Sequence, residues 1–258
     1  SILVKGWAIA RQYPEPGLRP YTDLDLMVPP GRAVAARAAL VRPPAIPCLV
    51  DLHEGSGRLD ALDLDTLRER SEIASLGGCR VRVLGPEDHL RVLALHALRH
   101  GVFRPLWLVD LAVAVERRPA TFDWARCLGP TPRHAGWVAT ALGLAARLLG
   151  ARVEEPPAPS RGALPGWLVR AVLRNWERGE GTSHLEPVFP ALVARLGDPG
   201  RLWAEARRRW DRPIEATLEM GCAFTRFPPW PIQVAAVVRR APELVRAVRA
   251  AGTRRRGR

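Results

Sequence analysis

Short apolar runs alternate with polar, proline-rich or glycine-rich stretches over the first third of the chain. Such runs predict strands where two-residue alternation holds, and helices where apolar residues recur every three to four positions. The strands are expected at 1–6, 23–28, 46–55 and 79–84, and the helices at 6–13, 29–41 and 63–74, with a loop at 13–21.

The pattern changes after Gly85, where apolar residues begin to recur at helical spacing. Pro86 and the acids Glu87 and Asp88 are typical of a helix start. We therefore expect a small α/β module at 1–85 and a helical region at 86–258. Helices are predicted at 85–101, 103–118, 131–150, 166–177, 188–210 and 231–251, with a proline-rich connector at 154–166.

The composition indicates a protein with a hydrophobic core and argues against a membrane-spanning segment. The chain has 258 residues, 47% of them hydrophobic, so it can bury a core, and no run reaches the roughly 18 apolar residues that a membrane span needs. It begins with Ser1 inside an apolar run, so we expect upstream residues to be missing. The cysteines are far apart and form no CxxC pair, which fits a reducing compartment and a cytoplasmic protein. They are Cys48, Cys79, Cys127 and Cys222.

The basic residues are distributed unevenly. The formal net charge is +13, and Lys5 is the one lysine among 39 basic residues. Its survival beside Gly6 suggests a need for a compact ammonium group. Residues 201–258 hold 14 arginines against 5 acids. This excess favours contact with RNA, DNA or an anionic surface, although a solvated helix face and tail would have the same composition.

Two aspartates interrupt an apolar strand at DLDLMV (23–28). Asp23 and Asp25 are two apart and should project from one face, while Leu24 and Leu26 enter a core on the other. Close carboxylates repel each other unless a cation lies between them, and oxygen ligands favour Mg²⁺ or Mn²⁺. Asp51 lies in a second apolar strand, and pairing of the two strands would bring three carboxylates together around two metal ions.

Other polar residues within apolar segments have several interpretations. His53 lies two residues after Asp51 and should share its face near the ions, in contact with their ligands, unless it is structural. His96 and His100 have the HxxxH spacing of some zinc sites, but the glutamate of HExxH is absent, so a structural role is favoured. Asp110 needs a buried partner. We expect that partner to be Arg99, His100 or Arg104.

The segment LVKGWAIARQYPEPGLRPYTDLDLMV (3–28) resembles the opening of the uncharacterised nucleotidyltransferase family within the DNA polymerase β-like superfamily. VDLHEG (50–55) resembles the family's third-carboxylate strand, and the helices at 85–118 resemble its helical segment. The resemblance covers roughly residues 2–150. It implies an α+β fold in which a small mixed sheet is followed by helices.

The resemblance also implies roles for individual residues. Asp23 and Asp25 would ligate both metal ions, and Asp51 would ligate the catalytic ion and assist deprotonation of the acceptor hydroxyl. Lys5 and Gly6 would lie at the triphosphate, and Arg19 could contact phosphate. Many superfamily members have Gly-Ser or Gly-Gly at this turn, whereas here Trp7 follows Gly6. The lysine would then take over the phosphate contact.

These observations predict a Mg²⁺- or Mn²⁺-dependent transfer of a nucleoside monophosphate from an NTP to a hydroxyl, with ATP among the candidate donors. The acceptor could be RNA such as tRNA, a protein or peptide, or a small molecule. A glycosyltransferase that uses DxD to hold a nucleotide sugar is an alternative, as is a non-catalytic binding protein of this fold. The P-loop and dinucleotide-binding signatures are absent from the sequence.

Overall fold

A computed structural model describes residues 1–40, 49–55, 62–153, 164–179, 200 and 212–239. The chain divides into two compact units. The first comprises Ser1–His96 and Leu106–Gly162, and the second comprises Ala97–Pro105 and Ala163–Arg258. The domain boundary expected between residues 85 and 86 stays a prediction.

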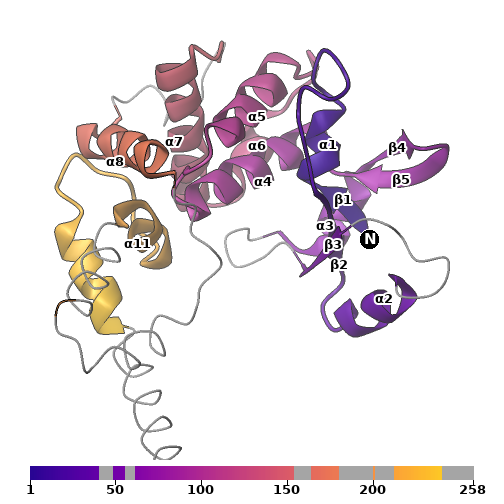
Figure 1. The fold of residues 1–258 in the computed structure, drawn as a ribbon, viewed down its shortest axis with the longest axis horizontal. Coiled ribbons are helices and arrows are strands. Elements are labelled where there is room, and N and C mark those ends of the chain that lie inside the picture. The colour runs from indigo at the N-terminus through magenta and orange to yellow at the C-terminus, as the bar shows by residue number, and fades with distance from the viewer. Residues whose placement is uncertain (41–48, 56–61, 154–163, 180–199, 201–211, 240–258) are drawn as a thin grey trace, which may run out of the picture. The chain divides into compact units, whose positions relative to one another are not determined.

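The first unit contains a mixed five-stranded sheet with the order β3-β2-β1-β5-β4 (Figure 1). β1 pairs antiparallel with β2 and parallel with β5, β2 pairs parallel with β3, and β4 pairs antiparallel with β5. With the helices that follow, this sheet confirms the expected α+β fold. The strands are β1 (Ile2–Val4), β2 (Asp23–Val28), β3 (Leu49–Glu54), β4 (Glu72–Leu76) and β5 (Cys79–Val83).

The alternation of side chains along β1 and β2 gives the sheet two apolar faces. On one face, Ile2, Val4 and Met27 pack with Leu64 and Leu67 of α3 (Leu64–Glu69). On the opposite face, a buried cluster includes Leu3 of β1 and Ala8 of α1 (Gly6–Ala10), and Leu24 and Leu26 of β2 pack against it. The prediction that Leu24 and Leu26 enter a core away from the aspartates is therefore confirmed.

The helix expected at 63–74 is too long. α3 ends at Glu69, and residues 72–76 form β4, which pairs with β5 in a hairpin. Gly77 and Gly78 make the turn with φ values of +55° and +82°. Two consecutive positive φ angles are typical of the tight hairpin turns that glycine permits. The Gly-Gly pair was thus the sequence signal for a strand that helical spacing obscured.

Helices follow the sheet along the chain, and α4 to α7 lie near one another in Figure 1. Helix α7 (Pro132–Leu149) is preceded by Thr131, whose side chain accepts a hydrogen bond from the backbone N–H of His134, and is followed by Gly150 in a left-handed conformation. Both features are common helix caps. The helices are α2 (Ala33–Leu40), α4 (Pro86–Arg99), α5 (Pro105–Glu116), α6 (Trp124–Leu128), α7 (Pro132–Leu149), α8 (Gly166–Arg178) and α11 (Pro213–Glu219).

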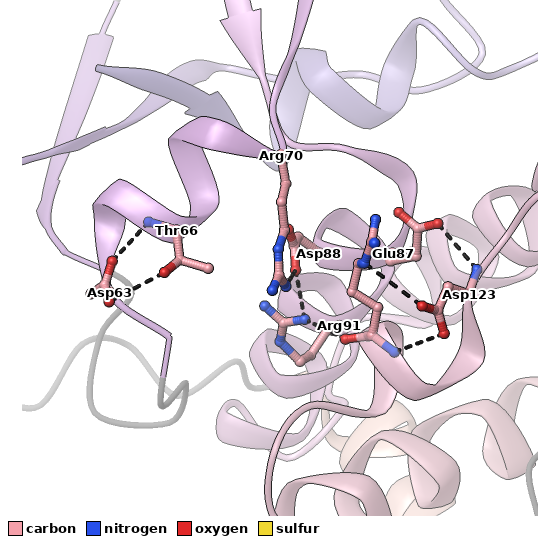
Figure 2. Close-up of polar contacts among 8 residues, drawn as sticks. Asp63, Thr66, Arg70, Glu87, Asp88, Arg91 and Asp123 are labelled. Atoms are coloured by element: carbon pink, nitrogen blue, oxygen red, sulfur yellow. Dashed lines mark hydrogen bonds and ion pairs between the residues drawn. The ribbon is translucent and has the colours of Figure 1, made fainter.

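A buried ion pair holds the start of α4 against its neighbours (Figure 2). Asp88 and Arg91 lie 2.7 Å apart, with side chains 2% and 0% exposed. Arg91 also donates to the carbonyl oxygen of Arg126 in α6, and Arg70, directly after α3, comes within 3.8 Å of Asp88. A buried charge needs such partners. The network therefore ties α3, α4 and α6 together.

Some expected elements lie wholly or partly outside the described residues. The helix expected at 188–210 is one of them, since Gly200 is the single described residue within it. Of the helix expected at 231–251, residues 230–239 are helical and the rest lies outside. Within the part of the chain that is described, no helix combines the length and apolar character needed to cross a membrane.

Candidate functional site

A tight turn joins β1 to α1 at Lys5 and Gly6. Lys5 has φ +51° and Gly6 has φ +26°. A positive φ in a residue with a side chain is uncommon and often marks a functional position. A Cβ on Gly6 would lie 3.3 Å from the Asp23 carbonyl oxygen and 3.6 Å from Asp25 Oδ2. Glycine therefore lets the turn approach β2 closely, beside the Asp25 carboxylate.

The parallel pairing of β2 with β3 brings the candidate ligands to one face of the sheet. Asp25 is aligned with Asp51, and Met27 is aligned with His53. Residues two apart on a strand share a face. Asp51 and His53 thus project on the same side as Asp25, in the strand pairing that the sequence predicted.

The polar side chains of this face converge on one carboxylate oxygen. Oδ1 of Asp25 lies 2.6 Å from Nζ of Lys5 and 2.8 Å from Nε2 of His53. Nε2 of His53 also lies 3.2 Å from Nζ of Lys5 and 3.3 Å from Oδ2 of Asp51. Two carboxylates, an imidazole and an ammonium group therefore meet on one face of β2 and β3, beside the end of β1.

Burial differs sharply between the two carboxylates. The Asp25 side chain is 10% exposed, whereas that of Asp51 is 55% exposed. Burial raises the pKa of the Asp25 carboxyl, but the hydrogen bond with His53 and the charge of Lys5 outweigh burial and hold the pKa below its usual value. Asp25 is consequently ionised at neutral pH, and Asp51 offers a carboxylate that solvent can reach.

The donor set suits a divalent cation. One ligand atom from each of Asp25, Asp51 and His53 lies within 4.8 Å of the others. Oδ1 of Asp25 and Nε2 of His53 both contact the ammonium group of Lys5, so these two atoms can share one positively charged group. Carboxylate oxygens suit Mg²⁺ and Mn²⁺, and imidazole suits transition ions. The residues present therefore fit a divalent metal ion.

Asp23 lies outside this group. It is partly exposed on β2, two residues before Asp25, and is aligned with Leu49 rather than with an acidic residue of β3. His53 takes the third place among the clustered donors. The sequence pattern placed His53 on the correct face. It predicted that His53 contacts the metal ligands and did not indicate that His53 could itself be a ligand. The metal-binding role of Asp23 stays a prediction.

Arg19 is engaged with Asp110 of α5. Its Nε and Nη2 atoms donate to the two carboxylate oxygens of Asp110 over 3.1 and 2.8 Å, and Tyr13 donates to the same carboxylate over 2.7 Å. The partners expected for Asp110 were wrong. We expected Arg99, His100 or Arg104, but the carboxylate faces the loop before β2. A phosphate contact by Arg19 stays a prediction.

His96, the first histidine of the HxxxH spacing in α4, lies against an aromatic ring. His96 packs edge-to-face on Trp107 of α5, with ring centroids 4.9 Å apart. Among the described residues, the Asp25, Asp51 and His53 group is the one set of three or more potential ligands that comes together. The aromatic packing supports the structural interpretation of the HxxxH spacing.

Comparison with known proteins gives a family match. Residues 48–150 match the model of a family described as uncharacterised nucleotidyltransferase. This range runs from β3 to the end of α7 and includes Asp51 and His53, while Lys5, Gly6 and Asp25 precede it. No curated protein and no solved structure gives a significant match. Over residues 48–150 the resemblance to the uncharacterised nucleotidyltransferase family is confirmed.

Proposed function

We propose that the protein transfers a nucleoside monophosphate from an NTP to a hydroxyl group and releases pyrophosphate. The observation that carries the proposal is the convergence of Asp25, Asp51 and His53 beside the Lys5–Gly6 turn. Clustered carboxylates can hold divalent metal ions that bind a triphosphate. A nearby ammonium group and an open backbone turn can bind the phosphate oxygens directly. The family match supports the same class of reaction.

The roles proposed for the residues are those that the family resemblance implies, and burial and charge support them. Asp25, ionised and buried, would be a fixed ligand for a divalent ion, with Asp51 and the predicted ligand Asp23 completing the acidic set. A bound divalent cation supplies charge neutralisation of the phosphates and lowers the pKa of a bound hydroxyl. The Lys5 ammonium and the open backbone at Gly6 would contact the phosphates.

The reaction itself needs little covalent chemistry from the protein. The acceptor oxygen bonds to the α-phosphorus, and the bond from the α-phosphorus to the bridging oxygen breaks, so pyrophosphate leaves with that oxygen. The hydroxyl proton passes to the exposed carboxylate of Asp51. Most of the rate enhancement would come from positioning and from stabilisation of the developing charge.

The acceptor is proposed to be a nucleic acid, such as the end of a tRNA. This rests on the 14 arginines of residues 201–258, many of which lie outside the described part of the chain. Binding through phosphate contacts falls steeply with salt. The acceptor proposal therefore predicts RNA binding that weakens as salt is raised, and salt-insensitive or absent binding contradicts it.

The test of the function compares three proteins. Wild type, Asp25→Asn and Asp65→Asn are incubated with each α-labelled NTP, Mg²⁺ or Mn²⁺, and pools of RNA, protein or small molecules. Asp65 is an exposed aspartate in the first turn of α3, so its variant controls for loss of one acid. Transfer by wild type and Asp65→Asn but not by Asp25→Asn supports the proposal. Absence of transfer to every pool supports a non-catalytic binding protein instead.

A further inference from the structure

The imidazole of His53 turns inward to the carboxylates although the side chain is 35% exposed. Its Nε2 atom lies 2.8 Å from Asp25 Oδ1 and 3.3 Å from Asp51 Oδ2. A partly exposed histidine could instead point its nitrogen to water. The inward orientation places a nitrogen donor between the two oxygen donors of β2 and β3.

The chemistry of one ring nitrogen limits what this contact can be. Neutral imidazole has one nitrogen that donates a hydrogen bond and one that offers a lone pair. In the first tautomer, Nε2 carries the proton and can donate a hydrogen bond to a carboxylate. In the second tautomer, Nδ1 carries the proton, and the lone pair of Nε2 faces the ammonium of Lys5 at 3.2 Å. In the second tautomer, nitrogen and oxygen lone pairs point together toward a cation.

The spacing of the three donor atoms suits coordination. In an octahedral site with metal–ligand distances of roughly 2.1 Å, neighbouring ligand atoms are about 3 Å apart. Nε2 of His53 lies 2.8 and 3.3 Å from its two oxygen neighbours. Small movements would therefore let one ion contact the nitrogen and both carboxylates.

We propose that His53 is a direct metal ligand, and that its nitrogen makes the site select a first-row transition ion such as Mn²⁺ over Mg²⁺. Imidazole binds transition ions well and Mg²⁺ poorly, whereas a site made only of carboxylates discriminates less between Mg²⁺ and Mn²⁺. The inference extends the proposed function, since the same ion would serve the transfer. It concerns the identity of the ion, which the three-carboxylate prediction left open.

The experiment measures metal binding by the full chain without a transfer assay. Mn²⁺ is titrated and followed by electron paramagnetic resonance, Mg²⁺ affinity is obtained by competition, and pulsed spectra detect ¹⁴N coupling to bound Mn²⁺. The variants are His53→Asp, which supplies an oxygen ligand, and His53→Gln, which removes the ring nitrogen. His134→Gln in α7 is the control, and circular dichroism shows which variants are folded.

Wild type and His134→Gln are expected to show directly coordinated nitrogen, and either folded His53 variant is expected to lose it. His53→Asp should lower the ratio of Mn²⁺ to Mg²⁺ affinity by about tenfold or more. Absence of nitrogen coupling in wild type, its persistence in the His53 variants, or an unchanged ratio would overturn the inference. If the metal-binding result overturns the inference but the protein still transfers NMP with Mg²⁺, the proposed function stands. Failure of the inference and failure of the proposed function are therefore distinguishable.

Discussion

The guanidinium of Arg19 and the carboxylate of Asp110, 91 residues apart in the chain, face each other through two hydrogen bonds. Their side chains are 10% and 1% exposed. Arg19 belongs to the loop between the Lys5–Gly6 turn and the aspartates of β2, and Asp110 belongs to α5. The pair therefore anchors the loop that precedes the candidate site.

Removing one partner of this pair should destabilise the fold. Asp110→Ala leaves the guanidinium of Arg19 largely buried without its counter-charge, and we expect the free energy of unfolding to fall by about 3–5 kcal/mol. Tyr13→Phe removes one neutral donor to the same charged carboxylate and should cost less, about 1.5–3 kcal/mol. Urea unfolding measures both variants. Equal losses for the two would contradict the importance of the ion pair.

The Gly6 position should tolerate no side chain. Gly6→Ala adds a Cβ that lies 3.3 Å from the Asp23 carbonyl oxygen at a positive φ, so the turn must move away from β2. We expect NMP transfer to fall by about 100-fold, comparable to the loss of one well-placed phosphate contact. Steady-state kinetics with the donor NTP measures this effect.

Gly17→Ala is the matched control for this variant. Gly17 also has a positive φ, +92°, but a Cβ there meets no atom within 4 Å. Both variants should lose about 1–2 kcal/mol of stability from backbone strain. Transfer should be retained by Gly17→Ala, and an equal loss of transfer in both would mean that strain alone explains the effect.

Lys5 should be replaceable by neither arginine nor a neutral residue. A planar guanidinium cannot occupy the place of a compact ammonium 2.6 Å from Asp25 Oδ1 and 3.2 Å from His53. We expect Lys5→Arg and Lys5→Met each to reduce kcat/KM for the NTP by about 100-fold. Normal kinetics for Lys5→Arg would show that any positive charge suffices there.

His89 should make the fold sensitive to acid. It is 2% exposed, and burial, with a smaller contribution from the charge of Arg11, lowers its pKa to about 3. An unfolded histidine has a pKa of about 6.5. Between these two pKa values the unfolded chain binds one more proton than the folded chain. Protonation of His89 in the unfolded chain therefore leaves the free energy of unfolding almost unchanged above pH 6.5 and lowers it progressively as the pH falls toward 3.

The slope of this loss is about 1.4 kcal/mol per pH unit, so lowering the pH from 6.5 to 5 should cost about 2 kcal/mol through His89. His89→Leu removes the titrating group. Urea unfolding at pH 7 and pH 5 should show a smaller loss for the variant than for wild type, by about that amount. Identical pH dependence in the two proteins would contradict the assignment.

The sequence predicted the parts of the site that depend on strand periodicity. Two-residue alternation placed Asp25, Asp51 and His53 on one face, and pairing of two apolar strands brought them together. The hairpin strand β4 was missed because EIAS continued the helical spacing of residues 63–70. The partners of Asp110 were missed because they lie in a distant loop, and only tertiary packing brings Tyr13 and Arg19 to α5.

The measurement that tests the central claim most directly follows the fate of two phosphates of one nucleotide. Wild-type protein receives the same NTP labelled at the α- or the γ-phosphate, with a divalent cation and the acceptor pool. Nucleotidyl transfer predicts that the α label enters the acceptor and the γ label appears in pyrophosphate, and that Asp25→Asn abolishes both. Entry of the γ label into the acceptor, or transfer that is unchanged in Asp25→Asn, would contradict the account.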